Sequence, residues 1–384
     1  MRQNCFIFVS FIFIGFISLF LFSCNQQQLS LDEVNQRSPA TSIQLQVDGK
    51  PTESVLIGIE PYLTQFQYST EEAFYFEMSR YLNRAKSDGY IIKDHTVVIL
   101  PEYIGTWFAI TEEDKSLFVE DSLEAAMTGL VKNHIFSFLT TYLFDKSHAD
   151  DSLKESLFRM KAKSMAEIYQ SVFSRLAREY GVIIIPGSIV LPQPEISNGK
   201  IVVTDGPLEN VSFYFHSDGS VDSKISRKIY PTADELPFLT AGRLADSPVY
   251  DSPIGKLSTI ICADSWYPDV YRNLANVDVV VIPSLITPAS SYHSIWPGYS
   301  GFENPVDVDS NDYGKITEQQ AWQKYAMPSR IQSTKVKAGM NVFFRGHIFD
   351  LDSAGEAQLY QNRLNLPQRL AQKEDSGRIY VMFL

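Results

Sequence analysis

Short runs of β-branched and other apolar residues constrain the fold of this chain more than any other feature. They cover residues 55–59, 96–100, 182–185, 259–262 and 279–282. Runs this short, bounded by turn or charged residues, are typical of buried strands. Helical spacing of apolar residues separates the early runs, at 71–87 and 165–180. Strand pairs joined by turns recur later. We therefore predict an α/β fold, a four-layer α-β-β-α sandwich with two sheets face to face and helices outside.

Weaker signals complete the predicted order of elements. Helical patterns also occur in pieces between 112 and 180, at 268–275 and at 325–337. Further short strands are predicted at 201–203, 211–215, 341–344 and 346–351.

The N-terminus has the pattern of an export signal. Arg2 precedes an apolar run over residues 5–22, and Ser23 and Cys24 follow it. A basic start, a short apolar stretch and small residues at its end indicate a bacterial signal peptide. The tetrad that ends in Cys24 resembles a lipobox, in which this cysteine is acylated and becomes the first mature residue.

This pattern divides the chain into three parts. We predict a lipoprotein signal peptide at 1–23, a lipidated N-terminus and flexible Gln- and Ser-rich tether at 24–53, and one domain at 54–384. The alternative is an apolar run that is not cleaved and anchors the chain itself. Both alternatives place the domain outside the cytoplasm, held to a bacterial membrane and facing the periplasm or the cell exterior.

Composition and cysteine usage narrow the function. Acidic residues outnumber basic ones, 45 to 33, and no cluster of Lys and Arg with interleaved aromatics occurs, so we expect no nucleic-acid partner. No convincing Cys/His spacing suggests a metal, and we expect no cofactor. Of the three cysteines, only Cys262 lies outside the N-terminal segment. An unpaired cysteine in an exported protein is either reactive or a buried, inert core residue.

A reactive cysteine needs a base for its proton and a donor for the oxyanion that its attack creates. The six histidines show no pattern near a strand end. Glu102 directly follows an apolar strand, Lys228 follows an Asp-Gly turn, and Cys262 ends another strand. Strand ends are where α/β sheets place their sites.

Three motifs in order carry a family resemblance: Pro101-Glu102, Arg227-Lys228-Ile229, and "IICADSWYPDVYRNLA" followed by "VVVIPS". With these motifs the chain from Val55 to Leu384 resembles the nitrilase superfamily of carbon–nitrogen hydrolases.

The resemblance implies a fold of that type and a Glu-Lys-Cys triad. Glu102 would be the general base, Lys228 would stabilise the oxyanion together with the backbone N–H of Ala263, and Cys262 would be the nucleophile. Glu235 would be the second glutamate, which holds the lysine and the substrate. The implied reaction is hydrolysis of a non-peptide carbon–nitrogen bond through a cysteine thioester.

Departures from the family bear on the substrate. Ala263 stands where nitrilases usually carry tryptophan, which favours a small-molecule amide, or a ureido compound, over a nitrile. Two segments look inserted, at 107–162 and 286–320. The first contains an apolar stretch, either an outer-layer helix or a lid or membrane-resting patch; the second is a candidate substrate-determining loop. The candidate substrate-binding residues are Tyr103, Tyr292, Trp296 and Tyr299.

Two other functions stay open from the sequence. One is N-acyl transfer by the same triad, and the other is a surface binding protein that keeps the hydrolase fold without catalysis. The family resemblance also implies a homo-oligomer.

Overall fold

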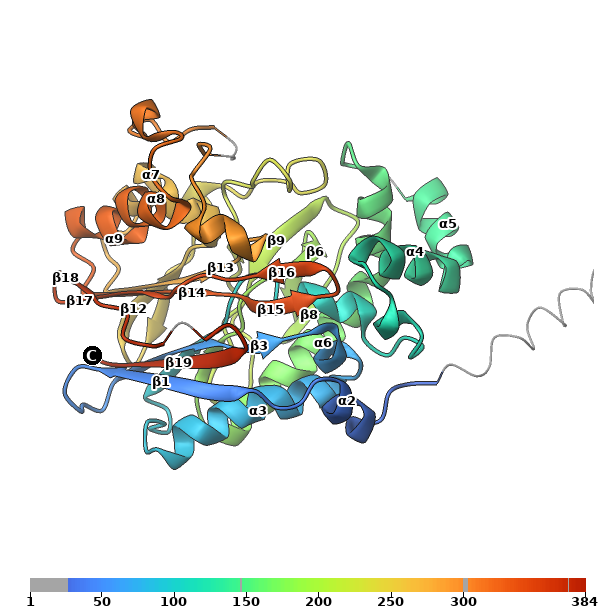
Figure 1. Cartoon of the computed structure of the whole chain (residues 1–384), viewed down its shortest axis with the longest axis horizontal. Helices are drawn as coiled ribbons and strands as arrows, with labels where there is room; N and C mark the ends of the chain where they lie inside the picture. Colours follow the sequence, from blue (N-terminus) through green and yellow to red (C-terminus); the bar gives the residue numbers. More distant parts are fainter. Residues whose placement is uncertain (1–26, 146, 300–302, 372) are drawn as a thin grey trace, which may run out of the picture.

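The computed structural model describes residues 27–145, 147–299, 303–371 and 373–384. The predicted signal peptide and Cys24 lie outside these ranges. The α-β-β-α sandwich is confirmed: two sheets stack face to face, and helices cover their outer faces (Figure 1). Within the described ranges, no helix has both the length and the apolar content needed to cross a membrane.

The first sheet has the strand order β1-β19-β2-β4-β5. Its strands are Ser42–Asp48 (β1), Ser376–Phe383 (β19), Val55–Glu60 (β2), Thr96–Ile99 (β4) and Ile183–Ile185 (β5). The last three pair in parallel, and β19 joins them antiparallel. Helices α3 (Glu71–Ser87) and α6 (Ser152–Tyr180) bury the outer face of this sheet. Both faces are therefore covered, which explains why most side chains of its central strands are apolar; the buried Glu60 of β2 is paired with Arg378 of β19.

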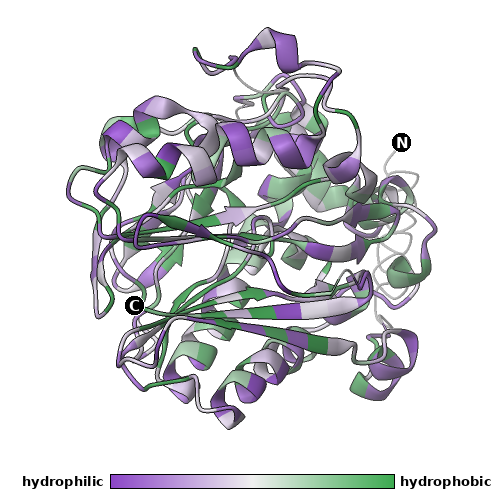
Figure 2. Ribbon diagram, turned by 60° about the vertical axis from the view of Figure 1, so that its left-hand side comes forward, coloured by the Kyte–Doolittle hydropathy of each residue, from purple (hydrophilic) through white to green (hydrophobic). Residues whose placement is uncertain are grey.

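The second sheet has the order β11-β12-β13-β14-β17-β18. Its strands are Tyr250–Ser252, Gly255–Thr259, Val279–Ser284, Ala338–Phe343, Gln358–Gln361 and Leu364–Leu366. Helices α7 (Pro268–Arg272), α8 (Glu318–Tyr325) and α9 (Met327–Arg330) pack on its outer face. Side chains such as Val97 and Ile99 of the first sheet meet Val281 and Met340 of the second. Figure 2 shows the apolar residues gathered in the stacked strands.

The remaining elements flank this core. Three small sheets consist of β6 (Ile189–Pro192), β9 (Leu208–Ser212) and β10 (Ser226–Arg227); β3 (Tyr62–Leu63), β15 (Arg345–Ile348) and β16 (Leu351–Ser353); and β7 (Glu195–Ser197) and β8 (Lys200–Val202). The other α-helices are α2 (Leu31–Arg37), α4 (Leu123–Asn133) and α5 (Ile135–Phe144). The short 3-10 helices are η1 (Gln65–Tyr68), η2 (Thr106–Ile110), η3 (Leu117–Val119), η4 (Leu244–Asp246), η5 (Cys262–Trp266), η6 (Ala289–His293), η7 (Ser310–Asp312) and η8 (Ile331–Ser333).

Within the described residues 27–53 the chain folds onto the domain, in contrast to the flexible tether predicted over residues 24–53. Ser30 caps α2 through a capping box with Glu33, and Leu29 and Val34 are buried. Strand β1 then pairs with β19 along its whole length. Polar residues alternate with apolar ones in β1, as expected for an edge strand with one covered face. This alternating stretch is short and lies within a polar segment, so the sequence did not indicate a strand here.

Two element boundaries also differ from prediction. The expected helix over 325–337 is replaced by α8 and α9, which meet at Ala326, where the chain turns extended shortly before Pro328. The strand predicted to end at Cys262 ends at Thr259, and Cys262 begins η5.

Candidate active site

Four charged or nucleophilic side chains from distant segments meet at one edge of the sandwich. Glu102 follows β4 of the first sheet, Cys262 follows β12 of the second, and Lys228 follows β10. The Lys228 Nζ lies 2.8 Å from Glu102 Oε1 and 2.7 Å from Glu235 Oε2. All four residues are buried. The structure thus brings the predicted triad and the second glutamate together.

Cys262 lies at a strained turn. Its φ of 46° is in the left-handed region, which side chains with a Cβ rarely adopt. The thiol donates to the carbonyl oxygen of Leu285 at 3.7 Å, and it partly offsets the rise that burial causes in the pKa of the neighbouring Glu102. The turn between β12 and η5 therefore places the sulfur beside the carboxylate, and both residues line the same cleft.

A close approach of two loops fixes Glu102. Gly187 has φ 68°, and a Cβ there would lie 1.8 Å from the carbonyl oxygen of Pro101. The absence of a side chain at this position lets the loop after β5 press against the loop after β4. Ser188 then accepts a hydrogen bond from the backbone N–H of Tyr103 at 2.9 Å.

Asn210 and Tyr103 complete the polar network. The Asn210 side-chain N–H₂ donates to Glu102 at 2.9 Å and to Glu235 at 3.3 Å. The backbone carbonyl oxygen of Asn210 accepts from the backbone N–H of Lys228 at 2.9 Å. The Tyr103 hydroxyl donates to Glu235 at 2.5 Å. Each buried carboxylate is therefore held by more than the lysine alone, as burial of a charge requires.

Asp264 ties the cysteine turn to the lysine segment. Its carboxylate accepts from the backbone N–H groups of Ile229 at 3.0 Å, Tyr230 at 2.7 Å and Ile261 at 3.3 Å. Burial raises the pKa of Asp264 to about 7, although these donors and the nearby lysine lower it. This residue stands in the cysteine motif, but its sequence context does not indicate which distant segment it would bind.

The two glutamates have opposite electrostatic environments. Burial raises the pKa of Glu102; Lys228 opposes that rise, and the neighbouring Glu235 adds to it. At Glu235 the effect of burial is outweighed by Lys228, Tyr103 and the backbone N–H of Thr232, so its pKa is lowered. Two titratable groups pushed apart in this way typically take different roles. Of the two carboxylates beside Lys228, Glu235 is therefore the harder to protonate and Glu102 the easier.

Burial and the nearby Glu102 raise the pKa of the Cys262 thiol well above its usual value, and Lys228 only partly offsets this. The pKa of Lys228 is also raised, because the two carboxylates outweigh its burial. The resting site therefore holds a protonated thiol and a lysine ammonium beside two glutamates.

A cleft of about 1180 Å³ opens over the cysteine. Both inserted segments line it. Its apolar walls include Trp107, Leu123, Met127, Val131, Phe138, Leu157, Phe158, Trp266 and Trp296.

Three of the four predicted substrate-binding residues line the cleft: Tyr103, Trp296 and Tyr299. Tyr292 is not one of the described lining residues: it is 1% exposed and packs on Phe343 in the core of the second sheet. The sequence of a loop does not indicate whether an aromatic side chain in it will face the cleft or pack into the core. Ala263 lines the cleft directly after the cysteine.

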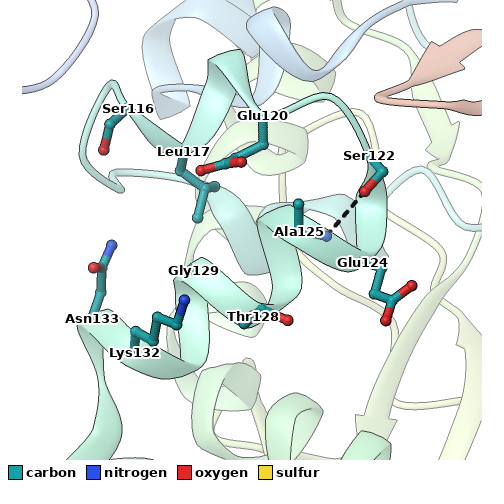
Figure 3. A pocket seen from close by; sticks show the side chains of 10 residues that line it. All are labelled: Ser116, Leu117, Glu120, Ser122, Glu124, Ala125, Thr128, Gly129, Lys132 and Asn133. Carbon is teal, nitrogen blue, oxygen red and sulfur yellow. Dashed lines mark hydrogen bonds between the residues drawn. The ribbon is translucent and has the colours of Figure 1, made fainter.

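Helix α4 separates this cleft from a smaller polar depression of about 490 Å³ (Figure 3). Glu124 and Thr128 border both hollows. In the part of the chain that the structure describes, no group of three or more His, Cys, Asp or Glu side chains is placed to hold a metal ion.

The family model for carbon-nitrogen hydrolases matches residues 95–301, more than half of the chain. The chain therefore belongs to the carbon–nitrogen hydrolase family and is an enzyme of that class. The matched region contains Glu102, Lys228, Glu235 and Cys262.

Individual relatives are more distant. A probable hydrolase of Bacillus subtilis (strain 168), YhcX, is 28% identical over 127 residues, 33% of this chain and 22% of that protein. The chain thus spans about a fifth of the length of this curated relative.

Two solved structures were found in comparisons with this chain. A carbon-nitrogen hydrolase from Helicobacter pylori G27 is 15% identical and covers 86% of this chain and 88% of its own, with a TM-score of 0.51. An amidase from Nesterenkonia sp. is 11% identical and covers 83% of this chain and 86% of its own, with a TM-score of 0.48. At these identities the likeness concerns the fold.

Proposed function

We propose that this chain hydrolyses amides through a thioester on Cys262, with Glu102 and Lys228 as the other members of the triad. One observation carries the proposal: a buried lysine is held between two carboxylates of opposed pKa, and one of them faces the only cysteine in the described part of the chain. A charged cluster that only stabilised the fold would not need a thiol beside it.

The proposed reaction first acylates Cys262 and then hydrolyses the thioester. Cys262 transfers its proton to Glu102 while its sulfur bonds to the amide carbon. The oxyanion that forms faces the Lys228 ammonium and the backbone N–H of Ala263. The carbon–nitrogen bond then breaks, and the leaving amine takes the proton from Glu102. Glu102 next accepts a proton from water, whose oxygen attacks the thioester, and the thiol and a carboxylic acid are released.

The cleft supports a substrate with a large apolar group. Its volume far exceeds what the smallest primary amides need, and aromatic and aliphatic side chains form most of its walls. Phe138, Leu157 and Phe158 come from the inserted segment, so this lining belongs to the insertion rather than to the sandwich. We therefore infer an amide with an acyl or alkyl chain.

A series of amides tests both parts of this proposal. We expect kcat/KM to rise with acyl length from acetyl to decanoyl, because each buried methylene contributes about 0.8 kcal/mol. Cys262→Ala, Glu102→Gln and Lys228→Met should each lose about a thousandfold or more in kcat.

Glu209→Gln is the matched control. Glu209 is also a buried carboxylate with a cationic partner, Arg227, but it does not line the cleft. An unchanged rate in Cys262→Ala would overturn the mechanism, and a flat dependence on acyl length would overturn the substrate class alone.

We also propose that the chain is attached to a bacterial membrane at its N-terminus, by a lipid on Cys24, and works outside the cytoplasm. The sequence pattern of residues 2–24 supports this. Mass spectrometry of the N-terminal peptide from membranes tests it, because an acylated Cys24 at the mature terminus is expected and an unmodified Met1 would contradict it.

A further inference from the structure

The folded domain begins almost directly after the proposed membrane attachment. The backbone N–H of Gln27 donates to the Asp114 carboxylate at 2.9 Å, and the N–H of Lys115 donates back to the Gln27 carbonyl at 2.7 Å. Gln27 is the third residue after Cys24 in the sequence, so the chain from one to the other spans at most about 10 Å. The side of the domain around Asp114 is therefore held close to any membrane that holds Cys24.

A buried ionic cluster connects this point to helix α5. Glu113, beside Asp114, accepts from Lys161 Nζ at 2.7 Å and contacts His134 Nε2 at 2.7 Å. His134 immediately precedes α5. Figure 1 shows α4 and α5 at the end of the molecule where the described chain begins. The helix thus lies on the side that the N-terminus fixes.

The surface of α5 is apolar and uncovered. Phe136 is 74% exposed, Leu143 64% and Phe144 81%. Ile135, Leu139 and Tyr142 are each about two-fifths exposed, and we call these six residues the α5 face. No charged residue occurs between Ile135 and Phe144. An exposed apolar patch of this extent marks a contact surface.

The α5 face also adjoins the cleft. Phe138, on the covered side of the helix, lines the cleft wall. Leu153 of α6 and Ile295 line the cleft as well, although each is more than half exposed, so they stand at its rim. An apolar surface therefore continues from α5 to the mouth of the site.

We propose that the α5 face rests on the lipid bilayer, so that the cleft opens beside the membrane surface. The proposal rests on the proposed membrane attachment at Cys24, and it does not depend on which reaction the site performs. Two independent observations converge on it: the short span to Gln27 and the uncovered apolar helix on the same side. Aromatic residues such as those of α5 favour the membrane interface.

The test uses the full chain in phosphatidylcholine vesicles with a tryptophan placed on either side of the domain. Phe136→Trp and Phe144→Trp place the probe on the α5 face. Phe76→Trp is the matched control, because Phe76 lies on α3 and is also half exposed. Emission is compared with that of the parent chain, in vesicles with and without phospholipid brominated on its acyl chains.

We expect brominated lipid to quench most of the added emission at positions 136 and 144 and almost none at position 76. Equal quenching at all three positions would overturn the proposal. So would blue-shifted but unquenched emission at 136, because a second copy or another part of the chain would then cover the face. A chain that fails to float with the vesicles overturns it too, and none of these readouts depends on amide hydrolysis.

Discussion

At the scale of single residues, the site separates two glutamates by their surroundings. Both carboxylates accept from the Asn210 amide, and Glu235 also has the Tyr103 hydroxyl and the Thr232 N–H as donors. The carboxylate with more donors keeps its charge, and the other is the easier one to protonate. In the proposed mechanism, one lysine therefore pairs with a glutamate that stays charged and with a glutamate that accepts a proton.

This difference predicts a pH profile. A carboxylate with a raised pKa accepts the thiol proton only above that pKa, so alkylation of Cys262 by iodoacetamide should decline as the pH falls through a value above 4.5. In Glu235→Gln the decline should shift to lower pH, because a neighbouring negative charge that raises the pKa of Glu102 is gone. Intact mass measured over time at each pH gives the rates.

In Glu102→Gln, alkylation of Cys262 should be slow and should no longer decline as the pH falls. If the alkylation rate of Glu102→Gln declined at the same pH as in the parent chain, the decline would belong to another titrating group. The prediction of separate glutamate roles would then be wrong.

At the scale of elements, the inserted helices decide the shape of the cleft. Helices α4 and α5 and the start of α6 supply part of its apolar wall, and the Glu113 cluster fastens them to the domain. The sequence predicted an apolar stretch here and left open whether it forms a packed outer helix, a lid or a patch that rests on the membrane. The structure shows that one side chain of α5, Phe138, is buried while most of the others face outward. Periodicity alone could not decide this, because α5 is apolar around its circumference.

Glu113→Gln should loosen this region. It leaves the buried Lys161 ammonium without its carboxylate, and breaking a buried pair typically costs about 3–5 kcal/mol. We expect a lower free energy of unfolding in urea and faster tryptic cleavage after Lys132, at the end of α4. Glu167→Gln is the control, since it breaks only an exposed pair with Lys163. Equal stability of the two variants would contradict the anchoring role.

At the scale of the whole molecule, the sandwich joins strand ends from two sheets into one site. The grouping of Glu102, Lys228 and Cys262 was predictable because each follows a predicted strand or turn, and the family resemblance implied the role of each. The partners Asn210 and Asp264 were not, because their contacts depend on how the two sheets stack. The tether prediction failed because β1 gains its stability from β19, more than three hundred residues later.

Acyl transfer to Cys262 is the central claim, and rapid acid quenching of the full chain during turnover of hexanoyl p-nitroanilide tests it most directly. Intact mass, followed by peptide mapping, should show a hexanoyl adduct on Cys262 that hydroxylamine removes. The adduct should be absent in Cys262→Ala and in Lys228→Met. Hydrolysis that continues in Cys262→Ala, or an adduct on another residue, would contradict the account.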